Sequence, residues 1–215
     1  MSVATAVPEG LAPERSVDEV DFDSIRLLEL RHRIKNLLGI VQAVAHQTLR
    51  SGRSIDEARK ALDGRLAAMG AAVDMLLNTG WTAAPLSELV GRSLVHAGSR
   101  IRAEGPHLVF NADAVTALTL VFHEMESNSI KYGALSADAG SVEISWSIVP
   151  GLTDRLELEW VERDGPACTT PSRQGFGSRM IVKLIGGRLR GTAETDYRPD
   201  GLHWRLSAPL AELLP

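Results

Sequence analysis

The chain has 215 residues, of which 44% are hydrophobic and 23% are charged, and its net charge is −4. This composition predicts a folded core and argues against a dedicated nucleic-acid-binding protein, because such proteins are usually strongly basic. The single cysteine, Cys168, excludes a disulfide framework and a cysteine-rich zinc site. The sequence has no apolar stretch of about 18 residues and no secretory signal, so we expect a soluble, cytoplasmic protein without membrane insertion.

The first predicted element is a long helix. Residues 1–20 combine prolines and a glycine with acidic residues, which predicts a flexible tail. From residue 21 to residue 50, apolar residues recur at alternating steps of three and four, the spacing of a coiled-coil seam. The residues on this seam are Leu27, Leu30, Ile34, Leu37, Val41, Val44 and Thr48. The segment Ser51-Gly52-Arg53 is expected to end the helix.

A second helix with the same apolar spacing is predicted over residues 55–78. Ser54 and Glu57 form a capping-box signature at its start. Asn78 and Gly80 favour its end, because both residue types are common where helices terminate.

The short turn between the two helices predicts an antiparallel helical hairpin over residues 21–80. A hairpin cannot hide two long apolar seams by itself. We therefore expect a homodimer that completes a four-helix bundle, and a monomer whose remaining residues cover the seams is the alternative.

The remaining residues, 85–215, alternate between helical and extended patterns. Helices are expected at residues 85–97, 112–132 and 178–185. Extended segments are expected at residues 100–102, 107–110, 142–148, 156–160, 189–197 and 203–207. This order predicts an α+β fold, in which the helical hairpin precedes an α/β sandwich with a mixed sheet covered by helices on one face.

His32 is the first candidate for chemistry. The heptad places it opposite the apolar seam, and Lys35 and Asn36 share its helical face one turn later. A neutral imidazole is a competent nucleophile, and nearby cations would stabilise a phosphorylated product. An ordinary solvated histidine explains the same spacing equally well. His46 occupies an equivalent heptad position without these neighbours and is the natural control.

A polar stripe on the helix predicted at residues 112–132 is the second candidate. Glu124, Asn128 and Lys131 follow one another at steps of four and three, so they share one face. These groups could hold a hydrated Mg²⁺ ion and a polyphosphate, since Mg²⁺ keeps several waters and needs few protein oxygens. A solvated polar helix face is the alternative.

A third candidate is the segment Gly175-Phe176-Gly177-Ser178, which directly precedes a predicted helix. Glycines permit close backbone approach, and a helix N-terminus attracts phosphate. A single Gly-x-Gly pattern is weak support when it stands alone.

Together these segments resemble the HWE family of bacterial histidine kinases, which are two-component signalling enzymes with a GHKL-type ATP-binding domain. The resemblance covers about residues 28–210 and rests on motifs in the family's order and spacing. The matching segments are His32-Arg33-Ile34-Lys35-Asn36, His123-Glu124-Met125-Glu126-Ser127-Asn128, Lys131-Tyr132-Gly133-Ala134-Leu135, Trp160-Val161-Glu162 and Arg173-Gln174-Gly175-Phe176-Gly177-Ser178.

The resemblance implies a role for each motif. His32 would be phosphorylated, and the catalytic segment would comprise His32, Arg33, Lys35 and Asn36. Asn128 would coordinate Mg²⁺ between the ATP phosphates. The residues implied at the ATP site are His123, Glu124, Asn128, Lys131, Tyr132, Glu162, Asp164, Gly165, Arg173, Gly175, Phe176, Gly177 and Ser178.

Some positions leave alternatives or depart from the family pattern. Either Glu162 or Asp164 would accept the hydrogen bond of the adenine amino group. Arg33 follows the phosphoacceptor where many other histidine kinases have an acid. The family usually has a small residue at the position of Glu126, and an added carboxylate near a triphosphate would weaken nucleotide binding.

The resemblance implies an ATP-dependent protein-histidine kinase that passes the phosphoryl group from His32 to an aspartate of a response-regulator receiver domain. A histidine phosphotransfer protein with a vestigial ATP site and a GHKL-type ATPase with a purely structural hairpin are the alternatives. The expected organisation is a tail (residues 1–20), a dimerisation and phosphoacceptor hairpin (21–80) and an ATP-binding domain (85–215). Because 20 residues are too few for an input domain, a separate sensor protein is one expected source of the signal.

Overall fold

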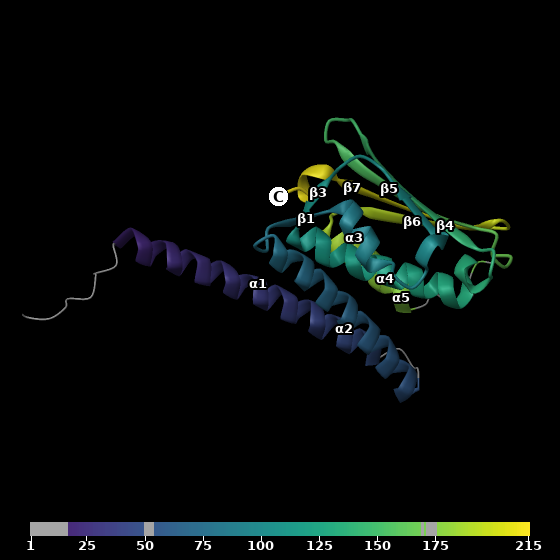
Figure 1. Cartoon of the computed structure of the whole chain (residues 1–215), viewed down its shortest axis with the longest axis horizontal. Coiled ribbons are helices and arrows are strands. Elements are labelled where there is room, and N and C mark those ends of the chain that lie inside the picture. Colours follow the sequence, from purple (N-terminus) through teal and green to yellow (C-terminus); the bar gives the residue numbers. More distant parts are fainter. Residues whose placement is uncertain (1–16, 50–53, 169, 171–175) are drawn as a thin grey trace, which may run out of the picture. The chain divides into compact units, whose positions relative to one another are not determined.

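A computed structural model describes residues 17–49, 54–168, 170 and 176–215 (Figure 1). The chain divides after His46 into two compact units, residues 1–46 and 47–215. In its described part, the first unit is a single helix, α1 (Val17–Leu49), whose last residues belong to the second unit. The helix begins before residue 21, where the apolar seam predicts its start. The predicted turn at residues 51–53 lies outside the described residues.

Helix α2 (Ile55–Asn78) opens the described part of the second unit with the predicted capping box. The Glu57 amide donates to the Ser54 hydroxyl over 3.3 Å, and the Ser54 amide donates to the Glu57 carboxylate over 3.0 Å. Two of the backbone amides that lack helical partners at this end are thereby satisfied. The helix ends at Thr79, and Gly80 follows with φ of +63°, as its predicted role at the helix end requires.

The strands form a five-stranded sheet in the order β2-β4-β5-β7-β6. Their bounds are Ile101–Glu104 (β2), Ser141–Val149 (β4), Arg155–Arg163 (β5), Thr192–Arg198 (β6) and Gly201–Pro209 (β7). Strand β2 pairs with β4 in parallel and all other neighbours are antiparallel, which confirms the predicted mixed sheet. Two short strands, β1 (Ala83–Pro85) and β3 (Val109–Asn111), pair separately and were not predicted as a sheet of their own.

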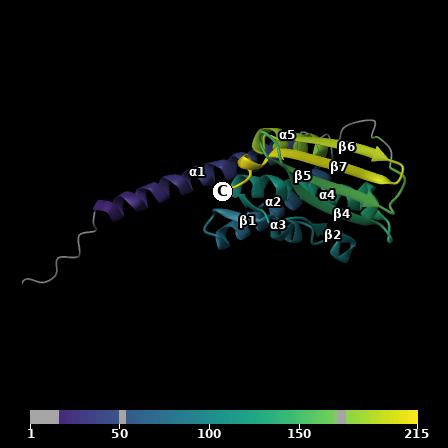
Figure 2. The same ribbon diagram turned by 90° about the horizontal axis from the view of Figure 1, so that it is seen from above.

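The helices predicted at residues 85–97, 112–132 and 178–185 cover one face of this sheet, as Figures 1 and 2 show. Helix α3 (Leu86–Ser93) is shorter than the pattern predicts, because the chain turns at Leu94 into the loop before β2. Helix α5 (Phe176–Arg188) is longer at both ends than predicted. The α+β prediction is confirmed.

Helix α4 (Ala112–Tyr132) lies at the centre of the second unit and has the predicted bounds. The Asn111 side chain caps its start by accepting from the Ala114 amide over 2.9 Å. Most of its residues from Ala114 to Glu126 are buried, because α4 packs against α2 and α5 and contributes to the core beneath the sheet. A polar side chain on the middle of α4 must therefore find a partner inside the protein.

Within the described residues, no helix has the length and apolar character needed to cross a lipid bilayer.

Candidate functional site

The predicted phosphoacceptor is on α1, within the first unit. His32 and Lys35 are exposed, and Arg33 and Asn36 are partly buried. The Asn36 amide nitrogen lies 3.5 Å from Nδ1 of His32, the contact expected of residues four apart on one helical face. This contact restrains the imidazole through one ring nitrogen and leaves the ring accessible to solvent.

In the second unit, the carboxylate of Glu124 lies inside the protein, where it meets a cation from α2. Arg65 donates to it twice, from Nε to Oε1 and from Nη2 to Oε2, both over 2.8 Å. The same guanidinium donates from Nη1 to the hydroxyl of Thr48 over 2.7 Å. The pair has the parallel, two-bond geometry that makes arginine–carboxylate contacts strong and directional.

The start of α5 packs against the predicted metal site. A Cβ atom added at Gly177 would lie 2.5 Å from Oε2 of Glu124 and 3.6 Å from Nδ2 of Asn128. Glycine therefore lets the backbone approach the Glu124 carboxylate, whereas the distance to Asn128 is an ordinary contact. The structure thus brings together three residues that the sequence analysis assigned to one site.

These residues fit a hydrated Mg²⁺ ion. An amide oxygen and a nearby carboxylate are hard oxygen donors, and Mg²⁺ is usually held by one or two of these together with water and phosphate oxygens. Among the residues that the structure describes, no group of three or more His, Cys, Asp or Glu side chains could enclose a metal. A site with few protein ligands, completed by phosphates, is consistent with both observations.

The end of α4 presents the remaining polar groups of the stripe to solvent. Lys131 and Tyr132 are exposed, and Nζ of Lys131 donates to the Ser127 hydroxyl over 2.9 Å. This long cation is one helical turn beyond Asn128, so it is placed to contact an anion held there.

The two acids proposed for adenine recognition, Glu162 and Asp164, lie in different surroundings. The buried carboxylate of Glu162 accepts from the Ala134 amide over 2.7 Å and from Nε1 of Trp160 over 3.2 Å. Asp164 is exposed at the end of β5, with φ of +56°. Gly165 packs directly on Ala134, because an added Cβ would lie 2.4 Å from the Ala134 Cα atom. Glu162 thus fixes the turn after α4, and Asp164 remains available to a ligand.

Glu126 faces a different neighbour. It is 1% exposed and accepts from the backbone amides of His96 and Ala97 over 3.1 and 3.2 Å, with Nδ1 of His96 at 3.2 Å. Its carboxylate is used to hold the loop after α3. The carboxylate of Glu126 therefore faces the loop at His96 and Ala97, and this position does not support the expected repulsion between Glu126 and a triphosphate.

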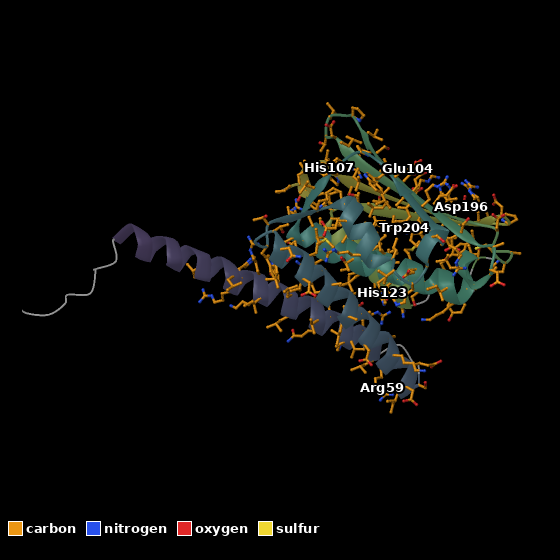
Figure 3. All side chains as sticks on the ribbon, viewed as in Figure 1. Arg59, Glu104, His107, His123, Asp196 and Trp204 are labelled. Carbon is orange, nitrogen blue, oxygen red and sulfur yellow. The ribbon has the colours of Figure 1, made fainter. Side chains whose placement is uncertain are left out.

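His123 packs on α2, where a Cβ at Gly64 would lie 3.1 Å from its Nε2 atom (Figure 3). Burial lowers the pKa of His123 below its usual 6.5; the Glu124 carboxylate opposes this shift and the Arg65 guanidinium adds to it. The ring of His123 is therefore packed on α2, in a position where burial disfavours its charged form.

Part of the predicted ATP site lies outside the residues that the structure describes. Arg173 and Gly175 lie outside the described residues, and only the backbone of Phe176 is described. Ser178 follows Gly177 in the first turn of α5 and is partly buried. The predicted phosphoacceptor His32 belongs to the other unit.

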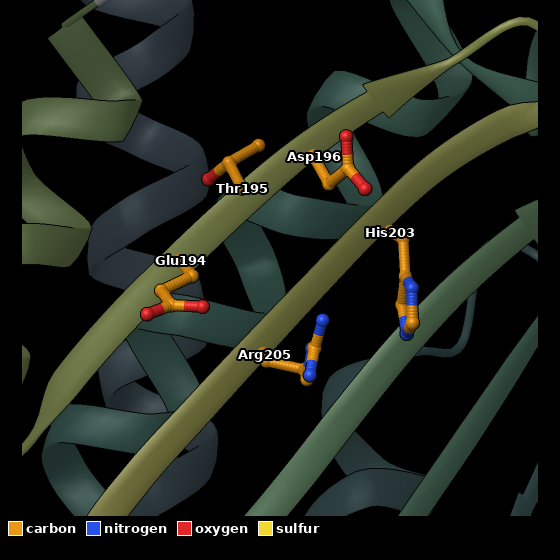
Figure 4. Close-up of a pocket in the computed structure, with 5 residues that line it drawn as sticks. All are labelled: Glu194, Thr195, Asp196, His203 and Arg205. Carbon is orange, nitrogen blue, oxygen red and sulfur yellow. The ribbon is translucent and has the colours of Figure 1, made fainter.

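A pocket on the opposite face of the sheet contains none of the predicted residues. It is lined by Glu194, Thr195, Asp196, His203 and Arg205 of β6 and β7 (Figure 4). Because side chains alternate along a strand, His203 and Arg205 lie on the face opposite the buried Trp204 and Leu206. The pocket is therefore separated from the candidate site by the sheet.

The sequence analysis missed Arg65 and Thr48 as site residues. The position of Arg65 in the sequence indicated that it is buried. It is three residues after Leu62 and four before Met69, so it lies on the apolar stripe of α2. A charge at a core-facing position needs a buried partner of opposite sign, and Glu124 provides it.

Solved structures with the same architecture show which class of protein domain has this fold. The histidine kinase domain from Erythrobacter litoralis EL346 blue-light activated histidine kinase has a TM-score of 0.55 and 16% identity, over 83% of this chain and 95% of that chain. A longer structure of the same kinase has a TM-score of 0.61 and 16% identity, over 87% of this chain and 59% of that chain. The fold is that of a histidine kinase domain.

Sequence relatives narrow the class to a family. Residues 29–107 match the profile of the HWE histidine kinase family. A blue-light-activated histidine kinase of Brucella anthropi is 36% identical over 208 residues, covering 94% of this chain and 42% of that protein. The corresponding protein of Brucella ovis is 33% identical over 193 residues, covering 87% and 40%. The chain spans less than half the length of these relatives, and it belongs to the HWE histidine kinase family.

Proposed function

We propose that the protein is an ATP-dependent protein-histidine kinase that phosphorylates itself on His32. The observation that carries this proposal is the approach of Gly177 to both Glu124 and Asn128, which would form a site for a metal and phosphates in a chain that also presents an exposed histidine. The related proteins from Brucella, named as blue-light-activated histidine kinases, support the same activity.

The chain's own residues would bind and orient ATP. Asn128 would hold Mg²⁺, Lys131 would contact a phosphate oxygen, and Asp164 would accept the hydrogen bond of the adenine amino group. When bound, Mg²⁺ would neutralise charge on the phosphate oxygens during transfer. Glu162 would act indirectly. It fixes the Gly133-Ala134 turn, which follows Lys131 at the end of α4 and packs against the residues at the end of β5.

His32 would supply the nucleophile. A lone pair on an imidazole nitrogen attacks the γ-phosphorus, the bond from that phosphorus to the β–γ bridging oxygen breaks, and ADP leaves. The ring proton is then lost to solvent. Arg33 and Lys35 would stabilise the phosphohistidine by charge, and Asn36 would limit rotation of the ring.

We propose a response-regulator receiver domain as the acceptor of the phosphoryl group and a second copy of the chain as the partner of the hairpin. Apolar side chains on α1 support the homodimer, because Leu30, Ile34 and Leu38 are 47%, 47% and 55% exposed. A separate sensor protein remains our proposal for the source of the signal. The division into a hairpin at residues 21–80 and an ATP-binding domain at 85–215 is likewise proposed.

Incubation with γ-labelled ATP and Mg²⁺ tests the function. We expect a label on the protein that is lost in acid and stable in base, absent from the His32→Ala variant and retained by His46→Ala. His46 is the matched control because it is also exposed on α1, and Gln47 and Leu49 stand where His32 has Arg33 and Lys35. Hydrolysis of ATP without any labelled protein would instead indicate an ATPase, and failure of the wild type to bind ATP would indicate a phosphotransfer protein.

A further inference from the structure

One residue of helix α2, the second helix of the proposed hairpin, reaches the candidate nucleotide site. Arg65 belongs to α2, is 2% exposed, and makes its two-bond contact with Glu124 from a position 59 residues earlier in the chain. Both residues lie within the unit of residues 47–215. Thr48, at the end of α1, accepts the remaining described bond of the guanidinium and is also fully buried.

A stability role alone is a poor explanation of this arrangement. Removing two charges from water is costly, and apolar side chains of similar volume often replace a buried ion pair without loss of stability. The pair therefore calls for a reason besides packing. Its position provides one, since Oε2 of Glu124 is both an atom that Arg65 binds and the atom that a Cβ added at Gly177 would meet at 2.5 Å.

The charge balance at this position matters for a phosphate ligand. Glu124 precedes Asn128 by one helical turn, so an unpaired carboxylate there would repel the negative charges of a triphosphate. Arg65 cancels that charge and fixes the direction of the carboxylate through its planar fork. The guanidinium is itself buried, so it acts on the ligand through Glu124.

We propose that Arg65 is a positioning residue for the phosphate end of the nucleotide site, and that helix α2 of the hairpin is therefore part of that site. This inference rests on the proposed function, because it assumes that the site binds ATP with Mg²⁺. The nucleotide affinity then depends on the packing of α2 against α4, which joins the hairpin to nucleotide binding through one ion pair.

The test compares MgATP with adenosine, which has the base and ribose but no phosphates. Both are titrated into the full chain by calorimetry, for the wild type and for the variants Arg65→Met and Arg65→Lys. Arg59→Met is the matched control, because Arg59 also lies on α2 but is exposed, in a surface pair with Asp56 at 3.8 Å (Figure 3). Thermal unfolding shows that each variant is folded at the temperature of the titration.

We expect Arg65→Met to weaken MgATP binding by about tenfold or more and adenosine binding by less than about twofold. Arg65→Lys keeps the charge without the fork and is expected to weaken MgATP by about threefold. If Arg65→Met does not fold, the MgATP and adenosine affinities of Arg65→Lys are compared with those of the wild type instead. Arg59→Met is expected to match the wild type for both ligands.

Three results would overturn the inference. Folded Arg65 variants with wild-type MgATP affinity would make Arg65 a packing residue only. Equal weakening of MgATP and adenosine would indicate general damage to the site, and tighter MgATP binding would show that the ion pair opposes the nucleotide. These results differ from failure of the proposed function, in which the wild type itself binds no MgATP and both proposals fall.

Discussion

The segment around His32 and the buried acids of the second unit have contrasting surroundings. His32 and Lys35 are exposed, and the imidazole has a long side-chain contact of 3.5 Å with the amide nitrogen of Asn36. Glu124, Glu126 and Glu162 are all buried, and each is bound by two or more donors. A nucleophile must reach a partner, whereas a binding site gains from groups that are already fixed.

This contrast has a practical consequence for mutagenesis. Substitution of an exposed residue such as His32 should change chemistry with little effect on folding. Substitution of a buried acid should change both, because the donors that it leaves behind lose their partner inside the protein. Activity losses at the acids therefore need a parallel measurement of stability.

Asn128→Ala should have the largest effect on binding. Asn128 is partly buried and provides the proposed metal ligand, so we expect MgATP affinity to fall about a hundredfold with little change in unfolding temperature. Calorimetric titration with and without Mg²⁺ measures the change. Asn36→Ala, which alters the α1 segment, should leave the affinity unchanged, and an Asn128 variant with normal Mg²⁺-dependent binding would exclude this residue as the ligand.

Glu126→Ala should have the largest effect on stability. It leaves the backbone amides of His96 and Ala97 without their acceptor, so we expect the free energy of unfolding to fall by about 2–4 kcal/mol. Urea denaturation checks this, with MgATP affinity of the folded variant expected to stay near the wild-type value. In the control Glu88→Ala, loss of the surface pair with Arg92 should cost about 0.5 kcal/mol.

Glu162→Gln and Asp164→Asn separate the two candidates for adenine recognition. We expect Glu162→Gln to lower the free energy of unfolding by about 1–2 kcal/mol, since its bonds to Ala134 and Trp160 are weakened, and to keep the preference for ATP over GTP. Asp164→Asn should lower that preference about tenfold without a stability change. The opposite pattern would assign adenine recognition to Glu162.

The smallest expected effect is on the pH dependence of stability. Burial lowers the pKa of His123 in the folded state, so the unfolded state binds more protons below the ordinary value of 6.5. Above pH 6.5 the ring is neutral in both states, and His123 does not lower the free energy of unfolding. As the pH falls from 6.5 toward the lower folded pKa, the unfolded state gains the proton first, and the free energy of unfolding decreases. Denaturation at pH 7.5 and 5.5 should therefore show a smaller difference in His123→Gln than in the wild type, and an equal difference would contradict the shift.

The features that local sequence determines were predicted well. The capping box at Ser54, the bounds of α4 and the hairpin of β4 and β5 all depend on residues close together in the chain. Asn36 was expected to share a face with His32, and it does. In these cases helical or strand periodicity alone fixes which side chains are neighbours.

The partners of the buried acids could not be predicted. Arg65 and Glu124 are separated by 59 residues, and His96 and Glu126 by 30, so their pairing depends on how whole helices pack. The polar stripe of α4 was recognised without its neighbour on α2. Glu126 was interpreted as a charge near the phosphates because its backbone partners after α3 leave no pattern in the sequence.

Strand β6 forms one edge of the five-stranded sheet, and its residues Glu194, Asp196 and Arg198 are exposed. Charged side chains along an edge disfavour the addition of a foreign strand, since each newly paired chain would have to accommodate them. On its outer side, β6 has no neighbouring strand among the described residues of the five-stranded sheet. The charged side chains therefore disfavour edge-to-edge pairing with another chain, which is a route to aggregation.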